Sequence, residues 1–140
     1  MKRRLLHDAL RMAFSKHSSH PMYGIGFTIF SFTVMENKIL EMGMNDSAWP
    51  VPKHWGYSKR KKGYGNFQEC IHSEIKAYSK SKGLICGNPF EIINVRLKDS
   101  GTIGLSAPCS CCVEWLGANN CSKVYFSTES GWAKMTLDNP

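Results

Sequence analysis

Segments with helical periodicity alternate along this chain with segments typical of β-strands. Hydrophobic spacing predicts helices over residues 3–16, from residue 67 to a stop at Gly83, and from Pro108 in a first turn to Gly117. Runs rich in β-branched and aromatic residues predict five strands, at 23–34, 38–44, 90–97, 123–127 and 132–137, and residues 102–105 extend the third of them after a turn at 99–101. The natural packing for this order is an α/β arrangement, in which helices cover a mixed sheet.

The direction of the last strand follows from the length of chain that remains. After Thr128 only residues 129–140 are left. A parallel return requires a crossover of about a dozen residues before the next strand begins. We therefore predict that segment 132–137 turns back through residues 129–131 and runs antiparallel to segment 123–127.

Length and composition set broad limits on the class of protein. A chain of 140 residues accommodates one hydrophobic core, so we predict a single domain over 1–140 with an inserted basic loop at 46–66. No apolar run approaches the ~20 residues of a membrane span, and residues 1–10 are too short and polar for a signal peptide. We expect a cytoplasmic protein without a membrane partner. In that reducing compartment cysteines more often bind metal, catalyse or lie buried than form disulfides.

The charge of the chain favours anionic partners. Eighteen lysines and arginines against eleven acidic residues give a formal net charge of +7. A basic surface of this kind suits phosphorylated small molecules or nucleic acid. The alternative is that the charge only keeps the protein soluble.

Three of the six cysteines lie in the stretch GLSAPCSCCVE at residues 104–114. Cys109 and Cys112 have the C-x-x-C spacing that places two side chains on one side of a helix, whereas Cys111 points elsewhere. Two such thiolates make half of a tetrahedral zinc site. The other cysteines, at positions 70, 86 and 121, are isolated from one another, so a site of four cysteines is disfavoured.

His72 offers a better completion of the site. One imidazole with two thiolates leaves the fourth position of zinc open for water, as in catalytic sites. Glu74 cannot share the direction of His72 along a helix, so it would stand beside the metal as a general acid and base. In the alternative interpretation, His72 and Glu74 form the polar edge of a helix, and the cysteines are small buried hydrophobic residues.

The motif H-S-E at 72–74, followed by P-C-S-C-C at 108–112, resembles the zinc-dependent deaminase superfamily, whose signature is H-x-E…P-C-x-x-C. The order of helices and strands resembles this family over nearly the whole chain, with a long insertion at 46–66. The resemblance implies a three-layer, cytidine-deaminase-like fold with a mixed five-stranded sheet flanked by helices. We predict a small superfamily member of the phage or bacterial type.

The resemblance also implies a role for each residue of the motif. His72, Cys109 and Cys112 would hold Zn²⁺, and a water activated by the metal would attack C4 of a cytosine. Glu74 would carry a proton from this water to the ring nitrogen and then to the departing ammonia. Further substrate contacts would come from Asn45 at the ribose, from the backbone around Ser106 and Ala107 at the base edge, and from Ser73 and Pro108.

Segment 46–66 combines cationic and aromatic side chains. Cations neutralise phosphates and aromatic rings stack on bases, so we predict that this loop contacts substrate beside the site. The members expected to do so are Trp55, Lys59, Arg60 and Lys61. The alternative is a charged, solvated loop without a ligand role.

Together these features predict an enzyme that deaminates cytosine to uracil in a phosphorylated substrate. That substrate is a cytosine nucleotide such as dCMP, or single-stranded DNA or RNA. Two alternatives stay open at this point, namely adenosine deamination in nucleic acid and a zinc-stabilised nucleic-acid-binding module without turnover. The oligomeric state stays open as well.

Overall fold

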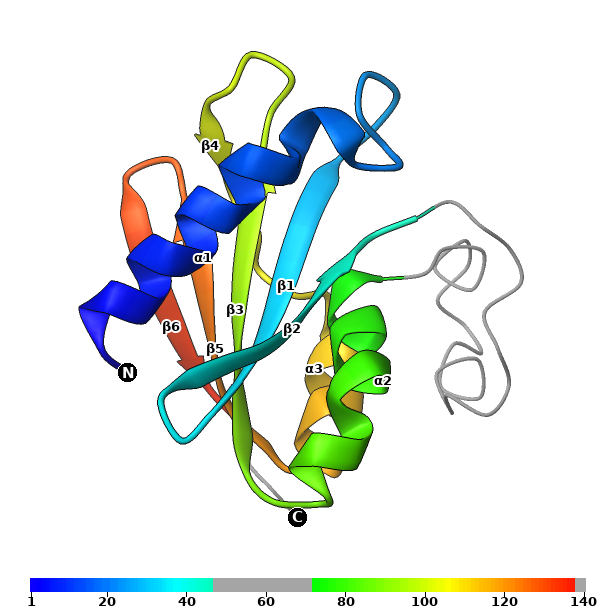
Figure 1. Ribbon diagram of the computed structural model, residues 1–140, viewed down its shortest axis with the longest axis vertical. Helices are drawn as coiled ribbons and strands as arrows, with labels where there is room; N and C mark the ends of the chain where they lie inside the picture. The colour runs from blue at the N-terminus through cyan, green and yellow to red at the C-terminus, as the bar shows by residue number, and fades with distance from the viewer. Residues whose placement is uncertain (47–71, 138–140) are drawn as a thin grey trace.

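The structure is a computed structural model that describes residues 1–46 and 72–137. Within these ranges a mixed sheet lies between one helix on one face and two helices on the other (Figure 1). The helices are α1 (Arg3–Lys16), the short 3₁₀ helix η1 (His17–Ser19), α2 (Ser73–Ile85) and α3 (Ser110–Ala118). The strands are β1 (Thr28–Met35), β2 (Lys38–Met44), β3 (Phe90–Leu97), β4 (Ile103–Gly104), β5 (Cys121–Thr128) and β6 (Gly131–Thr136).

The sheet contains the predicted five strands in the order β2-β1-β3-β5-β6, and in the described part of the chain β4 adds a sixth short strand beside β3. Strands β3 and β5 are parallel, and the other pairs are antiparallel. The predicted antiparallel return of the last strand is confirmed, because Gly131 pairs with Thr128 and Thr136 with Lys123. The predicted mixed, three-layer α/β fold is therefore present.

Helix α1 packs against one face of the sheet because its apolar residues share one side. Leu5, Ala9 and Ala13 are spaced one turn apart and are buried. They form a core with β1 and β3 residues that include Phe30 and Val95. Burying side chains of this size stabilises the fold by about 1.5–3 kcal/mol each.

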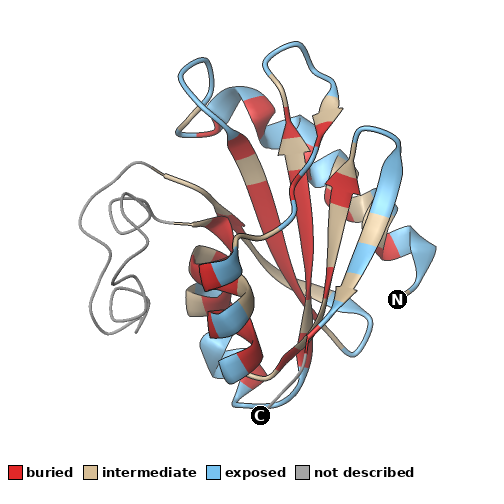
Figure 2. Ribbon diagram, turned by 180° about the vertical axis from the view of Figure 1, so that it is seen from behind, coloured by how far each residue is buried: buried red, intermediate tan, exposed pale blue. Residues whose placement is uncertain are grey.

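Helices α2 and α3 lie side by side over the opposite face (Figures 1 and 2). Their buried residues form a second core with β3 and β5, in which Tyr78 of α2 meets Trp115 of α3 edge to face with ring centroids 5.2 Å apart. Along β3, alternate side chains serve the two cores. Ile93 faces the α1 core, and Ile92 faces the α2–α3 core. Buried residues accordingly cover both the strands and the inner sides of these helices (Figure 2).

Strand β2 and helix α2 approach each other very closely at Gly43. A Cβ atom at this position would lie less than 3.0 Å from the backbone nitrogen of Ala77 and from the carbonyl oxygen of Ser73. Only a glycine allows this distance between the two backbones. Gly43 therefore fixes how near the first turn of α2, which carries part of the candidate site, lies to the sheet.

Gly83 does not end α2, which was predicted to stop there. The helix continues to Ile85, and Cys86 ends it in the left-handed conformation with φ 50° while its N–H bonds to the carbonyl of Lys82. Gly87 follows with φ 75°. A left-handed residue after the last turn satisfies the final carbonyl groups, and here a cysteine takes the position that glycine usually fills.

Other predicted boundaries also differ. Helix α2 begins at Ser73 rather than at residue 67, since His72 is its N-cap in an extended conformation. Strand β1 begins at Thr28 rather than at residue 23, because the preceding residues form turns in which the N–H groups of Ile25 and Gly26 both bond to Met22 O. Pro108 lies outside α3, since Cys109 is the N-cap and the helix begins at Ser110. None of the helices in ranges 1–46 and 72–137 combines the length and the apolar character needed to cross a membrane.

Candidate metal centre

His72, Cys109 and Cys112 meet where the N-terminal ends of α2 and α3 lie together. Nδ1 of His72 is 3.2 Å from Sγ of Cys112 and 3.7 Å from Sγ of Cys109. The three possible ligand atoms all lie within 4.8 Å of one another. His72 is the N-cap of α2 and Cys109 is the N-cap of α3.

The backbone around Cys109 explains why the two cysteines face the same point. Cys109 has an extended conformation, and its Sγ accepts a hydrogen bond from the N–H of Cys112 at 3.4 Å. Its carbonyl oxygen accepts the N–H of Val113 at 2.9 Å, which starts the helix. Cys111 is turned into the α2–α3 core and is fully buried. The C-x-x-C pair is thus one capped helical turn with both sulfurs near Nδ1 of His72.

The environment of Cys109 favours its thiolate. Its pKa is lowered from 9.0 to about 3, chiefly through the hydrogen bond with the Cys112 side chain and secondarily through the contact with His72, while burial acts in the opposite direction. The N-terminus of a helix also favours negative charge. Zinc binds cysteine as the thiolate, so this residue is prepared for a metal.

The geometry of the group fits zinc. Zinc prefers nitrogen and sulfur ligands in a tetrahedron, with bonds of about 2.1 Å to histidine and 2.3 Å to cysteine. Such bonds place nitrogen and sulfur about 3.6 Å apart. The separations of 3.2 and 3.7 Å between His72 and the two sulfurs lie close to this value. The three residues could therefore hold one zinc ion and leave a fourth position for another ligand.

Glu74 lies in the first turn of α2, two residues after His72, and its side chain is only 5% exposed. Oε2 accepts a hydrogen bond from the Nδ2 amide of Asn94 at 2.9 Å. The hydroxyl of Ser73 lies 3.4 Å from Oε1. The carboxylate is not part of the His–Cys–Cys group, although Glu74 follows His72 by only two residues.

Asn94 is the residue that sequence reasoning missed. It lies on β3, has no exposed surface, and faces the helices α2 and α3 rather than α1. The signal in the sequence was an amide within the otherwise apolar run IINV at 92–95. Buried polar side chains require partners, so such an asparagine indicates a specific hydrogen-bond network.

The serines predicted to contact substrate are buried within this network. Ser73 is 1% exposed and its hydroxyl bonds to the hydroxyl of Ser31 at 2.7 Å. Ser106 is 2% exposed and its hydroxyl bonds to the carbonyl of Asn94 at 3.0 Å. Both side chains therefore point into the protein. Ala107 is exposed and Pro108 is half-buried in the segment that precedes α3.

Both the oxygen and the nitrogen of the Asn45 side-chain amide form hydrogen bonds to the backbone. Its Oδ1 accepts the N–H of Ile29 and its Nδ2 donates to the carbonyl of Phe27, both at 2.9 Å. The side chain thus closes the end of the β1–β2 pair, and a ribose contact from it stays a prediction. The predicted contacts in the basic segment lie outside the described residues: Trp55, Lys59, Arg60 and Lys61.

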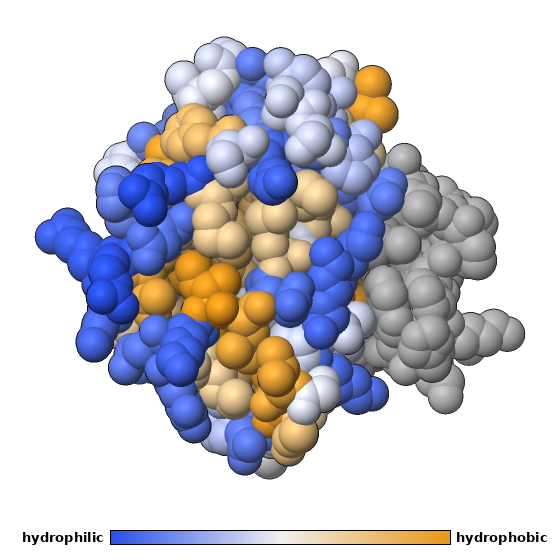
Figure 3. Space-filling model, in the orientation of Figure 1, coloured by the Kyte–Doolittle hydropathy of each residue, from blue (hydrophilic) through white to orange (hydrophobic). Residues whose placement is uncertain are grey.

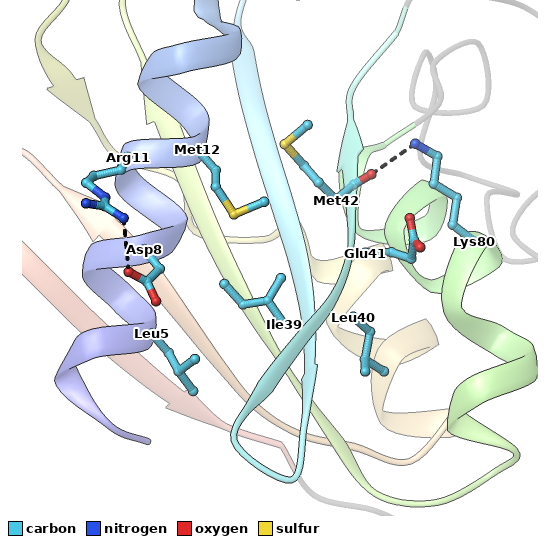
Figure 4. Close-up of a pocket in the computed structure, with 9 residues that line it drawn as sticks. All are labelled: Leu5, Asp8, Arg11, Met12, Ile39, Leu40, Glu41, Met42 and Lys80. Carbon is cyan, nitrogen blue, oxygen red and sulfur yellow. Dashed lines mark hydrogen bonds and ion pairs between the residues drawn. The ribbon is translucent and has the colours of Figure 1, made fainter.

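A separate groove of about 590 Å³ lies between α1, β2 and α2 (Figure 4). Apolar surface fills part of this face between α1 and β2 (Figure 3). In the groove, Lys80 donates to the carbonyl of Met42 at 3.0 Å, and Arg11 pairs with Asp8 at 3.7 Å. Its lining includes none of the possible metal ligands, so the groove is distinct from the metal centre.

Comparison with solved structures identifies the fold. A cytidine deaminase from Burkholderia pseudomallei matches with TM-score 0.61 and 17% identity over 97% of this chain and 93% of that one. A cytidine deaminase from Mycobacterium leprae matches with TM-score 0.57 and 12% identity over 91% of both chains. The dCMP deaminase of cyanophage S-TIM5 matches with TM-score 0.56 and 14% identity over 91% of this chain and 86% of that one.

No protein-family model matches the chain, and no curated protein is similar to it in sequence. The structural matches cover nearly the full length, and the predicted resemblance is confirmed at the level of the fold. The chain has the cytidine deaminase fold, and it brings one histidine and two cysteines together as a possible metal site.

Proposed function

We propose that this protein is a zinc-dependent deaminase that hydrolyses cytosine to uracil in a phosphorylated substrate. The observation that carries the proposal is the meeting of His72, Cys109 and Cys112 beside the buried carboxylate of Glu74. Solved structures of the same fold include cytidine deaminases and a dCMP deaminase, which supports a cytosine substrate.

Three residues would hold the metal in this proposal. His72 supplies a ring nitrogen, and Cys109 and Cys112 supply sulfurs from the first turn of α3. Zinc, when bound, supplies a Lewis acid that lowers the pKa of a water molecule to about 7 and so makes it a nucleophile near neutral pH. The lowered pKa of Cys109 means that this residue needs no further base to become a ligand.

Glu74 would move the protons of the reaction. Its carboxylate takes a proton from the attacking water and gives it to the ring nitrogen next to C4, while a new C–O bond forms at C4. It then takes the proton of the new C4 hydroxyl and passes it to the exocyclic amine as the C–N bond breaks, so that the C4 carbonyl of uracil forms and ammonia leaves. Because its surroundings are nearly closed to solvent, the side chain exchanges protons mainly with groups in the site.

A phosphorylated substrate is favoured by the charge of the chain. The net charge is +7, and residues 59–62 of the inserted segment read KRKK. This segment connects Asp46 with His72, and Asp46 pairs with Lys76, one turn after His72, at 3.7 Å. The two described residues that flank this segment, Asp46 and His72, therefore both lie at the first turns of α2, which carry the candidate site. Cationic side chains attract phosphate groups, and this supports a phosphorylated substrate.

A substrate panel tests the proposal. The zinc-loaded protein is incubated with cytidine, dCMP, dCTP, adenosine, single-stranded DNA and single-stranded RNA, and ammonia, uracil and inosine are measured. We expect uracil and ammonia in equal amounts from at least one phosphorylated cytosine substrate. Inosine without uracil would instead indicate an adenosine deaminase. Salt-dependent binding of nucleic acid without any ammonia would indicate a binding module.

A charge-matched pair of variants tests the role of the basic segment. Replacing Lys59, Arg60, Lys61 and Lys62 with alanine should raise KM for dCMP by about tenfold or more and leave cytidine turnover unchanged. The control replaces Lys2, Arg3, Arg4 and Arg11, which removes the same charge from α1 and its N-cap, on the face of the sheet away from α2 and α3. An equal effect of the two variants, or an equal loss with cytidine, would contradict a phosphate-binding role.

A further inference from the structure

A buried amide on β3 holds the carboxylate of Glu74. Asn94 is fully buried, and its Nδ2 donates one hydrogen bond to Oε2 of Glu74 at 2.9 Å and a second to the carbonyl of Ser106 at 3.1 Å. We propose that Asn94 is the positioning residue of the proposed deamination: it holds Glu74 by Oε2 and leaves Oε1 to carry the proton. This inference rests on the function proposed above.

The orientation of the amide is determined by its neighbours. Both groups that face Nδ2 are hydrogen-bond acceptors, a carboxylate and a carbonyl. The hydroxyl of Ser31 faces Oδ1 and donates to it at 2.5 Å. A rotated amide would place Oδ1 against two acceptors and Nδ2 against a donor. All the hydrogen-bonding groups of the Asn94 amide are therefore used in one orientation.

The single proton of each hydroxyl excludes Ser73 as an equal partner of Glu74. The hydroxyl of Ser31 donates its proton to Oδ1 of Asn94. In the 2.7 Å contact between Ser31 and Ser73, the donor is therefore Ser73. The 3.4 Å contact from Ser73 to Oε1 is then the longer and weaker of the two contacts of the Ser73 hydroxyl. Among the hydrogen bonds of the described residues, the bond from Asn94 is the short one that orients the carboxylate.

Asn94 also connects α2 with the segment that leads to α3. Its amide reaches Glu74 on α2 and the carbonyl of Ser106, which lies shortly before Cys109 on the chain. Ser106 returns a bond from its hydroxyl to the carbonyl of Asn94 at 3.0 Å. Glu74 and the segment that leads to the two cysteine ligands are thus both hydrogen-bonded to one residue of the central strand β3. Displacing a reacting group by about 1 Å can cost about 100-fold in rate, so this link matters for turnover.

Two variants of the zinc-loaded full chain test the inference. Asn94→Ala removes the amide, and Asn94→Asp keeps its shape but sets a second carboxylate against Glu74. We expect kcat for the best substrate of the panel to fall by about 10- to 100-fold in both, with KM changed less than about threefold and zinc content unchanged. A folded, zinc-loaded Asn94 variant with wild-type kcat would overturn the inference.

A matched control separates positioning from general stability. Thr33 of β1 donates to the hydroxyl of Ser81 of α2 at 2.9 Å, and both residues are fully buried between the same sheet face and helix. Thr33→Val removes this hydrogen bond without touching Glu74. We expect Thr33→Val to lower the Tm and to leave kcat unchanged. A loss of kcat equal to that of Asn94→Ala would show that any weakening of this interface suffices, and the inference would be overturned.

Ser31→Ala is a second test of the inference, to be used if the Asn94 variants do not fold. It leaves Asn94 and Glu74 in the chain and removes the hydroxyl that orients the amide. We expect kcat to fall by several-fold at unchanged zinc content. Wild-type kcat in this variant would overturn the inference.

A spectroscopic measurement distinguishes failure of this inference from failure of the proposed function. If the wild-type protein releases ammonia from no substrate, the proposed function fails, yet the hydrogen bond can still be measured. The side-chain amide signals of Asn94 in a ¹⁵N–¹H spectrum are assigned by their loss in Asn94→Asp. We expect Glu74→Gln to shift these signals and Thr33→Val to leave them in place. Unshifted signals in Glu74→Gln would overturn the positioning role.

Discussion

Nδ1 of His72 lies 3.2 Å from Sγ of Cys112, although the two residues are 40 positions apart in the sequence. They meet because α2 and α3 pack on the same face of the sheet and present their N-terminal ends at the same place. Helix α3 lies on the crossover between the parallel strands β3 and β5, so its N-terminus follows the carboxyl end of β3. Open α/β sheets typically bind ligands outside the carboxyl ends of their strands.

Loss of any one of the three possible ligands should remove the metal. We expect His72→Ala, Cys109→Ser and Cys112→Ser each to weaken zinc binding by more than about 100-fold, since even the outer partners of a metal ligand contribute about 10- to 100-fold. Elemental analysis after dialysis against a weak chelator measures the zinc retained. Cys86→Ser, at an exposed cysteine, is the control and should keep one zinc per chain. Full zinc retention in a ligand variant would contradict the site.

Replacing the acid should separate metal binding from turnover. We expect Glu74→Gln to keep its zinc and to lose about 10²- to 10⁴-fold in kcat, because the amide cannot carry the proton. Deamination assays and zinc analysis of the same preparation check both parts. Glu129→Gln is the control, since Glu129 is exposed and pairs with Lys98 at 2.8 Å. A Glu74→Gln variant that turns over at a rate near wild type would show that another group moves the proton.

The pKa of Cys109 predicts how the metal-free protein reacts with iodoacetamide. A pKa of about 3 leaves Cys109 as a thiolate at about pH 6, whereas an ordinary thiol with a pKa near 8.5 is protonated there. Burial raises the pKa of Cys121 to about 12, so that thiol should stay unmodified. Peptide mapping by mass spectrometry reads out each cysteine. We expect Cys109 to be alkylated at this pH and zinc to protect it.

The same lowered pKa makes metal-free stability depend on pH in a defined direction. Folding lowers the Cys109 pKa from 9.0 to about 3, so the thiolate contributes stability that is complete above about pH 9 and is lost as the pH falls toward 3. Absence of alkylation at about pH 6 in the folded, metal-free protein would contradict the lowered pKa.

Two glycine substitutions should have opposite effects on stability. Gly43→Ala places a methyl group against the backbone of α2, and we expect a loss of about 1–3 kcal/mol. Gly83→Ala lies within α2 with open space around the added Cβ, and we expect a gain of about 0.5–1 kcal/mol from the better helix former. Thermal unfolding of the zinc-loaded variants measures both. A destabilised Gly83→Ala would contradict the position of this glycine inside the helix.

Local periodicity was sufficient to predict most of the elements. The predicted ranges 3–16, 38–44 and 90–97 coincide with α1, β2 and β3, because each has a one-sided or continuous apolar pattern between clear turns. The antiparallel last strand also followed from the sequence, since the remaining chain was too short for a crossover. The C-x-x-C spacing likewise predicted that Cys109 and Cys112 would face the same point.

The errors lie where local propensity competes with tertiary contacts. Gly83 reads as a helix stop, yet the packing of Ile85 in the core carries α2 one half-turn further. Pro108 reads as a first-turn residue, yet the side chain of Cys109 caps the helix and moves its start. The helix preference of Gly83 differs from that of alanine by about 1 kcal/mol, which the burial of one side chain can exceed.

The alternation of elements and the spacing of the metal-ligand motif were properties of the sequence alone, because each depends on residues that are neighbours along one helix or strand. The partner of Glu74 was decided only by the tertiary structure. Asn94 reaches it because β1 and β3 pair with Ser31 opposite Asn94, and because α2 is rotated to turn Glu74 toward the sheet. Register and helix rotation are set by the packing of whole layers, and no local pattern of residues encodes them.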